Sequence, residues 1–193
     1  MVKILKTTDK SFEKDFENLL QKRNQDDQKI DKKVAKIIDD VKLRSDKALI
    51  DLTKKYDQLD AEEINDLVVS KKELDSSVKV IKEKTKKSLK RAIKRVRSYH
   101  QKQMPSNTMY KDKEGIILGG LWNPIQSVGL YVPGGTAGYP SSLIMNAVPA
   151  IVAGVERIVV TVPATYGRIN SLVLACCKFL GISEIYKVGG AQA

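Results

Sequence analysis

A glycine-rich segment at residues 129–142 holds the residues best suited to binding chemistry. It leaves a predicted strand, passes through the pair Gly134 and Gly135, and opens a predicted helix near Ser141. Glycines let a ligand approach the backbone closely, and a helix start offers free N–H groups to an anion. The segment therefore fits a phosphate cradle, although a tight strand-to-helix connection without a ligand fits it equally well. It matches neither the GxGxxG nor the GxxxxGK[ST] nucleotide motif.

A second glycine pair, Gly189 and Gly190, follows another predicted strand. In a parallel sheet the loops after successive strands lie at one edge, and ligands of open α/β folds bind there. Gln192 offers both a hydrogen-bond donor and an acceptor in that loop. The two glycine pairs are therefore expected to lie near each other.

Residues for metal binding or proton transfer are scarce. His100 is the one histidine, and the two cysteines, Cys176 and Cys177, are adjacent in sequence. Adjacent cysteines form neither a disulfide framework nor a CxxC motif, and a zinc site needs about three or four ligands. We expect His100 to be a structural or surface residue and the cysteines to pack as small apolar groups.

The elements that position these loops alternate in type. Strand patterns at 128–132, 157–162 and 184–188 enclose helix patterns at 142–153 and 169–180, which predicts a parallel sheet with crossover helices. Pro149 is expected to kink or restart the first of these helices, and Gly181 to cap the second in the left-handed conformation. A hairpin between 116–122 and 127–132 is also expected.

Residues before 115 read as helices. Apolar stripes mark helices near 12–20 and 30–41, Ser70 and Glu73 form a capping-box pair, and a long amphipathic helix is expected from 75 to 103, before Pro105. The predicted fold is thus α/β, with a helical amino-terminal region at 1–114 and an incomplete Rossmann-like parallel β-α-β-α-β unit at 115–193.

The composition is that of a globular protein, with 42% apolar and 30% charged residues. The sequence has no apolar run near the ~20 residues that cross a bilayer and no secretory signal, so we expect a cytoplasmic protein without a membrane partner.

The net charge of +11 invites a nucleic-acid interpretation. Four basic and two acidic residues lie in 121–193, which leaves 30 and 21 in 1–120. Lysines interleaved with carboxylates at helical spacing favour a solvated helix face, and no nucleic-acid partner is expected. A nucleic-acid binder remains an alternative that rests on charge alone, and a steep salt dependence of affinity would reveal it.

Several motifs together resemble histidinol dehydrogenase. The clearest are LYVPGGTA at 130–137, YPSS at 139–142, MNA at 145–147 and GGAQA at 189–193. Two looser matches lie upstream. VKLRSDKAL at 41–49 resembles the family's Arg-Gly-Asp segment with Ser45 in the glycine position, and YHQKQ at 99–103 resembles its aromatic-His-x-x-Gln element. The resemblance covers nearly the whole chain.

The resemblance implies NAD-dependent, zinc-dependent oxidation of L-histidinol to L-histidine, in histidine biosynthesis, by an enzyme that is a homodimer at full length. Tyr131 and Gln192 match family positions that contact NAD. The family's zinc ligands and acid/base pair lie beyond residue 193, so no catalytic or metal residue is assigned here, and the chain alone is expected to be an inactive fragment. The alternative is a non-catalytic binding or assembly module that reuses the half-fold, which titration with NAD would distinguish.

The chain also stops after the third predicted strand, where a covering helix is expected. A truncated product or a partial sequence would explain this ending.

Overall fold

The computed structural model describes residues 4–134 and 138–193, apart from the side chains of 22–28. Contacts divide the chain into two compact units, Met1–Ala48 and Leu49–Ala193. The first unit contains α1 (Phe12–Arg44), so the two amino-terminal stripes belong to one continuous helix. Phe12 and Phe16 stack on it with ring centroids 5.6 Å apart. Much of its apolar stripe is exposed, including Leu19 and Ile30.

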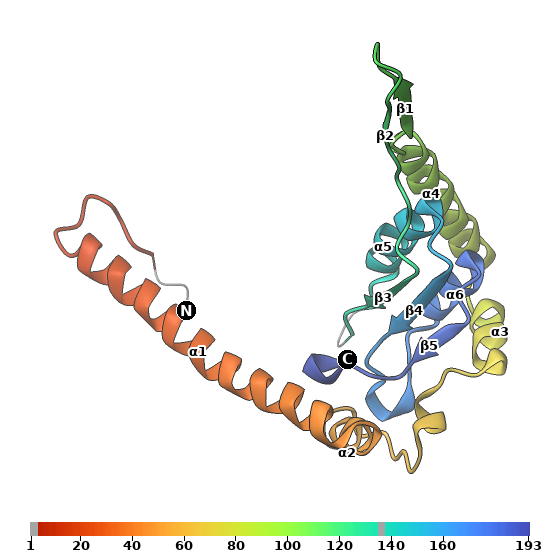
Figure 1. The fold of residues 1–193 in the computed structure, drawn as a ribbon. Coiled ribbons are helices and arrows are strands. Elements are labelled where there is room, and N and C mark those ends of the chain that lie inside the picture. Colours follow the sequence, from red (N-terminus) through yellow and green to blue (C-terminus); the bar gives the residue numbers. More distant parts are fainter. Residues whose placement is uncertain (1–3, 135–137) are drawn as a thin grey trace. The chain divides into compact units, whose positions relative to one another are not determined.

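The second unit carries the sheet and its helices (Figure 1). Helix α2 (Asp46–Asp57) leads into it. Its further elements are η1 (Ile64–Leu67), α3 (Lys71–Val80), α4 (Glu83–Gln101), β1 (Thr108–Lys111), β2 (Ile117–Gly120), β3 (Ser127–Tyr131), α5 (Pro140–Ala153), β4 (Arg157–Thr161), η2 (Thr165–Gly167), α6 (Ser171–Leu180), β5 (Glu184–Tyr186) and η3 (Gly190–Gln192).

The predicted parallel sheet is confirmed. Its strand order is β3-β4-β5, and both pairings are parallel, with Val160 opposite Leu130 and Ile185. Because side chains alternate across a strand, these three residues share the face that packs into the main core. Gly129 and Tyr131 belong to the opposite, more exposed face. The carboxyl ends of the three strands all lie at one edge of the sheet.

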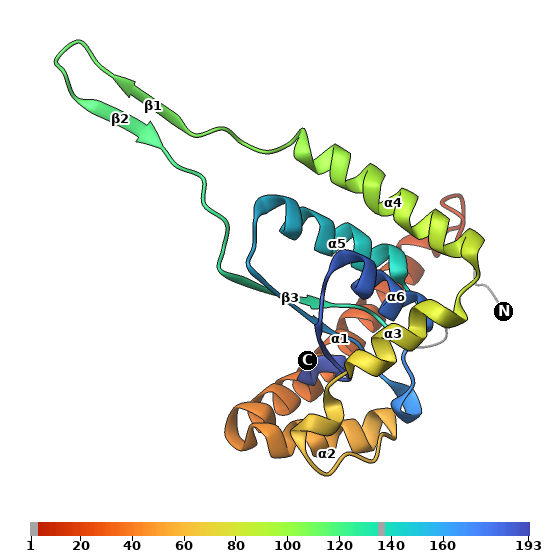
Figure 2. The ribbon, with the colours of Figure 1, turned by 90° about the vertical axis from the view of Figure 1, so that its right-hand side faces the viewer.

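Helices cover the apolar face in two layers (Figure 2). Helices α5 and α6 contact each other, while α4 packs on α5 and α3 packs on α6. The α/β fold class is therefore confirmed. The expected domain boundary between residues 114 and 115 marks a change of composition. The packing instead joins residues 49–193 into one unit, because α3 and α4 bury their apolar stripes on α5 and α6.

One edge of the sheet is extended by a segment that the sequence patterns do not predict as paired. Val69 N–H donates to the carbonyl oxygen of Ile185 at 2.9 Å, and Lys187 N–H donates to that of Leu67 at 2.7 Å. These bonds satisfy the outer edge of β5, which would otherwise present free backbone groups.

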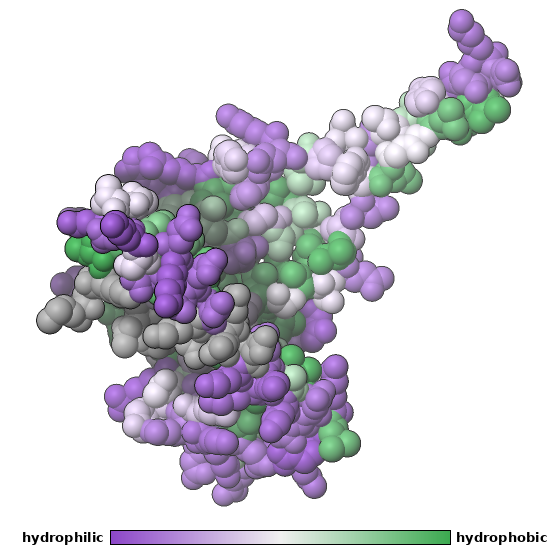
Figure 3. All heavy atoms as spheres, turned by 90° about the vertical axis from the view of Figure 1, so that its left-hand side faces the viewer, coloured by the Kyte–Doolittle hydropathy of each residue, from purple (hydrophilic) through white to green (hydrophobic). Residues whose placement is uncertain are grey.

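The expected hairpin between 116–122 and 127–132 is wrong, because β2 pairs with β1. The turn is closed by Asp112, whose carboxylate accepts the backbone N–H groups of Glu114 and Ile116 at 2.9 and 2.8 Å. Gly115 supplies a left-handed residue with φ of 90°. The result is an arm of two strands with exposed apolar side chains, including Met109 and Ile117 (Figure 3).

The expected single helix over 75–103 is also wrong. Helix α3 ends at Val80, Ile81 and Lys82 are extended, and α4 begins at Glu83. The break lets α3 reach α6 while α4 turns to pack on α5. The amphipathic period continues across the break, so the sequence pattern did not reveal it.

Helix ends follow the sequence more closely. The Ser70 and Glu73 capping box is confirmed, with Ser70 Oγ accepting the Glu73 N–H at 3.2 Å and Glu73 accepting the Ser70 N–H at 2.8 Å. Gly181 caps α6 with φ of 76°. Pro149 lies inside α5, and the helix continues through it to the left-handed cap at Gly154, although the missing N–H costs α5 one hydrogen bond.

Glu73 also ties α3 to the sheet, and its replacement gives the first testable prediction. Its carboxylate lies 2.8 Å from Nζ of Lys187. Burial opposes ionisation of Glu73, but hydrogen bonds from Lys187 and Ser70 outweigh it and hold its pKa below 4.5. We expect Glu73→Gln to lower the free energy of unfolding by about 1 kcal/mol at pH 7, since Glu73 is 38% exposed and solvent partly screens the pair.

The pH dependence follows from the direction of this shift. A lowered folded-state pKa stabilises the protein above the unfolded value, and the contribution is lost as the pH falls below 4.5. Urea titrations should therefore show the wild type and Glu73→Gln converging in acid. Glu83→Gln, at an exposed pair with Lys86, is the control and should have a smaller effect. Equal stability of wild type and Glu73→Gln at pH 7 would refute the role of this contact.

Candidate functional site

The three loops that follow β3, β4 and β5 are stacked at the carboxyl edge of the sheet. Pro163, after β4, lies between Gly134 and Gly189. A Cβ atom built on Gly134 would lie 2.3 Å from Pro163 Cγ, and one on Gly189 would lie 2.3 Å from Pro163 Cβ. Real Cβ atoms do not approach so closely, so both positions require glycine. One glycine of each pair therefore serves the packing of neighbouring loops.

The start of α5 is held against the start of α6 in the same way. A Cβ atom on Gly138 would lie 2.4 Å from Asn170 Cγ. Asn170 caps α6 by accepting the Leu172 N–H at 2.8 Å. The amino ends of both helices thus face the carboxyl edge of the sheet, where their free N–H groups favour anions. Gly135, Thr136 and Ala137 of the expected cradle lie outside the described residues.

Tyr131 and Gln192, the two expected cofactor residues, are brought together. The Tyr131 hydroxyl oxygen accepts the backbone N–H of Gly190 at 3.3 Å. Gly190 has φ of 68°, and the Gln192 side chain folds back over it. A Cβ atom built on Gly190 would lie 2.7 Å from Gln192 Oε1. The loop after β5 therefore rests on the last residue of β3.

Exposure separates the roles of these two residues. The Tyr131 side chain is half-exposed, whereas Gln192 is 6% exposed. No hydrogen bond of the Gln192 side chain is found within the part of the chain that the structure describes. Its amide can therefore still donate a hydrogen bond to a polar ligand and accept another from it.

A resident zinc ion does not fit the described residues. Among residues 4–134 and 138–193 no group of three or more His, Cys, Asp or Glu could hold a metal. Burial raises the pKa of both Cys176 and Cys177 to about 12, so these thiols stay protonated. His100 lies in the last turn of α4, with its ring at the edge of Tyr99, 5.1 Å between centroids. Its Nε2 is buried without a described partner.

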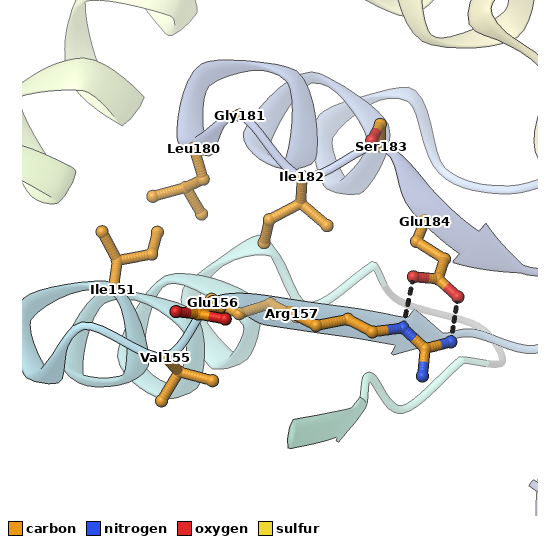
Figure 4. A pocket seen from close by; sticks show the side chains of 10 residues that line it. Ile151, Val155, Glu156, Arg157, Leu180, Gly181, Ile182, Ser183 and Glu184 are labelled. Atoms are coloured by element: carbon orange, nitrogen blue, oxygen red, sulfur yellow. Dashed lines mark hydrogen bonds and ion pairs between the residues drawn. The ribbon is translucent and has the colours of Figure 1, made fainter. Parts of the chain in front are cut away.

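The opposite edge of the sheet holds a separate hollow of about 290 Å³ (Figure 4). Ile151, Leu180 and Ile182 form its apolar wall. Across its mouth Arg157 donates two hydrogen bonds to the Glu184 carboxylate, one of them at 2.9 Å. This contact lowers the pKa of Glu184 and neutralises both charges. The hollow contains neither Tyr131 nor Gln192, and the sequence patterns gave no sign of it.

Pro163 and Asn170 are the site residues that sequence reasoning missed. A proline directly after a predicted strand is read as a strand end, which hides its contact with two glycines far away in sequence. Asn170 could have been found, because asparagine before an apolar helical pattern is a standard N-cap signal.

A parallel sheet with glycine loops stacked at its carboxyl edge is an α/β arrangement, and open α/β sheets bind their ligands at that edge. The family model for histidinol dehydrogenase matches residues 20–193. The chain belongs to the histidinol dehydrogenase family, which confirms the resemblance of its motifs.

Individual relatives agree. The chain is 44% identical over 193 residues to histidinol dehydrogenase of Brucella abortus (strain 2308), covering all of this chain and 45% of the relative. It is 44% identical over 185 residues to that of Rhizobium meliloti (strain 1021), covering 96% of this chain and 42% of the relative. The chain thus spans less than half the length of these relatives.

A solved structure supports the fold. The crystal structure of histidinol dehydrogenase from Elizabethkingia anophelis matches with a TM-score of 0.78 and 29% identity, covering 84% of this chain and 37% of that one. No helix among the described residues is both long enough and apolar enough to cross a membrane.

Proposed function

We propose that this chain forms part of the NAD site of a histidinol dehydrogenase that oxidises L-histidinol to L-histidine. The observation that carries the proposal is the hydrogen bond of Gly190 to Tyr131, because the Gln192 side chain folds over Gly190 and so lies near the half-exposed Tyr131 ring. The glycine-paired loops and two helix amino ends at the same edge suit a ligand that bears phosphates.

The roles of the two residues differ in kind. The Tyr131 ring offers an apolar surface for a planar group, and its hydroxyl holds the loop after β5 in place. Gln192 can donate one hydrogen bond and accept another, which fixes the orientation of a polar ligand. Bound NAD would supply the capacity to accept hydride. The described residues do not fit zinc, so we assign none of them a metal-dependent step.

The other functions proposed for the full-length protein rest on the family. We propose that residues 115–193 are its Rossmann-like nucleotide unit, that zinc and acid/base residues lie outside residues 1–193, and that it acts in histidine biosynthesis as a cytoplasmic homodimer. The match to the family model and the identity to the Brucella enzyme support this assignment.

Replacing Gln192 by alanine at the matching position of a full-length relative should weaken NAD binding about five- to thirty-fold. One or two polar contacts are worth about 1–2 kcal/mol, which corresponds to that range. The fold should survive, because Gln192 follows the last strand. Calorimetric titration with NAD measures the change, and a melting curve checks the fold.

Alanine at the position of Gln126, an exposed residue just before β3 at the opposite edge of the sheet, is the matched amide control and should leave NAD affinity unchanged. Unchanged affinity in a folded Gln192→Ala variant would contradict the proposed site. It would favour instead a non-catalytic binding or assembly module that reuses the half-fold.

A further inference from the structure

Nearly all of the net charge of the chain comes from one short segment. Residues 79–102 hold eleven of the 34 Lys and Arg residues but only one of the 23 Asp and Glu residues, Glu83. The other 169 residues hold 23 basic and 22 acidic side chains, so they are almost neutral. The charge of +11 is therefore a local property of this segment.

The segment is dominated by α4, which is amphipathic in the structure. Its apolar residues, including Ile93 and Val96, pack into the main core. At about 3.6 residues per turn its cations fall on the opposite side. We call the exposed Lys and Arg residues of this side the basic strip: Lys84, Lys87, Lys90, Arg91, Lys94, Arg95 and Arg97.

Most of the basic strip lacks counter-charges. Lys90 lies over the ring of Phe179, with Nζ 5.0 Å from the centroid. Glu83 pairs with Lys86 outside the strip and attracts Lys87 and Lys90 at longer range. The other six strip residues have no ion pair within the described part of the chain. Like charges three or four residues apart on a helix repel one another, and an anion spanning them would relieve this repulsion.

The strip also has a shaped surface. Lys84, Lys87 and Arg91 line a hollow of about 340 Å³ together with the hydroxyl-bearing Ser88. These residues belong to consecutive turns of one face, so three cations and a hydroxyl converge on one open space. Such a surface suits an anionic oxygen-rich group such as a phosphate.

Exposed aromatic rings follow the strip along the chain. Tyr99 lies in the last turn of α4 and is 60% exposed, while Tyr110 and Trp122 on the following arm are 60% and 66% exposed. Proteins that bind single-stranded nucleic acid combine a basic track for the backbone with aromatic rings for the bases. Both parts are present here.

We propose that the basic strip of α4 binds the phosphodiester backbone of single-stranded nucleic acid. A membrane surface fits less well, because the apolar side of α4 is buried on α5 and cannot insert. An acidic protein is the competing partner, and the hollow formed by Lys84, Lys87 and Arg91 favours a phosphate, whose oxygens can pair with several cations at once. This function is independent of the proposed NAD site, which lies at the carboxyl edge of the sheet.

This proposal departs from the expectation, based on the sequence, that the protein has no nucleic-acid partner. Over residues 1–120 as a whole, lysines alternate with carboxylates, which favours a solvated face and no nucleic-acid partner. Within residues 79–102 the carboxylates are almost absent, and the fold collects the cations on one exposed side.

The test is fluorescence anisotropy with a labelled 20-nucleotide single-stranded RNA and the matching DNA, using the 193-residue chain. Each phosphate contact on a single strand contributes about −0.7 to the slope of log affinity against log salt. We expect a slope near −3 for about four contacts. The triple variant Lys87→Glu, Arg91→Glu, Lys94→Glu should reduce the affinity at least thirty-fold. The salt dependence should become shallower, with a slope of about −1 in place of about −3.

A triple variant in α1, Lys32→Glu, Lys33→Glu, Lys36→Glu, makes the same change of charge at exposed positions, and its affinity for RNA should fall less than three-fold. The neutral triple Lys87→Gln, Arg91→Gln, Lys94→Gln should also bind weakly, and circular dichroism checks that each variant is folded.

Three outcomes would overturn the proposal. The first is that the folded α4 variants bind RNA as tightly as the wild type. The second is that the α1 control loses as much affinity for RNA as the α4 variant. The third is that polyglutamate, or vesicles rich in phosphatidylserine, displace the labelled RNA as effectively as unlabelled RNA does. The last result would assign the strip to an acidic protein or an anionic membrane surface.

Discussion

Gly189→Ala should destabilise the folded chain by about 3 kcal/mol, at the upper end of the cost of overpacking a well-packed site. The added Cβ would meet Pro163 Cβ at 2.3 Å and the Pro163 backbone Cα at 2.9 Å. Neither atom can rotate away, so the loop after β5 must shift and carry Gln192 with it. A urea titration followed by circular dichroism measures the loss of stability.

Gly134→Ala tests the same packing around Pro163, and a second substitution should restore the stability that it loses. The added Cβ would lie 2.3 Å from Pro163 Cγ but 3.1 Å from Pro163 Cβ. Pro163→Ala removes Cγ and should recover most of the stability lost by Gly134→Ala. It should not rescue Gly189→Ala, whose nearest contact is the Cβ that alanine retains.

Gly129→Ala is the control for both variants, because a Cβ there has no atom within 4 Å. It should change stability by less than about 0.5 kcal/mol. If Gly189→Ala were as stable as Gly129→Ala, the stacking of the loops around Pro163 would be incorrect.

The 193-residue chain alone should show no turnover of L-histidinol with NAD and zinc. Proton transfer near neutral pH usually requires a histidine or a carboxyl group of adjusted pKa close to the substrate. His100, the one histidine of the chain, is in the last turn of α4, and the described residues offer no metal ligand cluster. We expect the rate of NADH formation to stay at the background measured without protein.

A full-length relative assayed in parallel gives the positive control, and zinc content by atomic absorption gives a second readout. We expect the purified chain to retain less than about one zinc ion per ten molecules after dialysis, because its described residues offer no cluster of zinc ligands. NADH formation that scales with the amount of chain, after contaminating enzyme is excluded, would contradict this prediction.

The sequence predicted the elements with short-range signals well. The parallel unit followed from alternating apolar strands and amphipathic helices, and the cap at Gly181 and the capping box at Ser70 followed from spacing over three or four residues. These features depend on neighbours along the chain, so the sequence contains most of their cause.

Features set by distant packing were missed. The break at Ile81 depends on α3 and α4 having different partners, and the pairing of β2 with β1 depends on the turn around Asp112. The amphipathic period of one helix runs into the next, so nothing local marks the break.

The candidate site shows the same division. Tyr131 and Gln192 were named through resemblance, while their meeting at Gly190 required parallel strands in the right order. The glycine pairs suggested ligand approach, yet Gly134 and Gly189 also serve Pro163, which no sequence motif indicates.

A nuclear magnetic resonance titration of the isotope-labelled chain with NAD tests most directly whether the carboxyl edge of the sheet binds the cofactor. We expect amide signals at this edge, above all those of Gly190 and Gln192, to shift with NAD concentration, and Tyr131→Phe to reduce the shifts. Signals of Ile182 and Glu184 at the opposite hollow should stay in place. Shifts confined to that hollow, or no shift at Gly190 and Gln192 at millimolar NAD, would contradict the proposed NAD site.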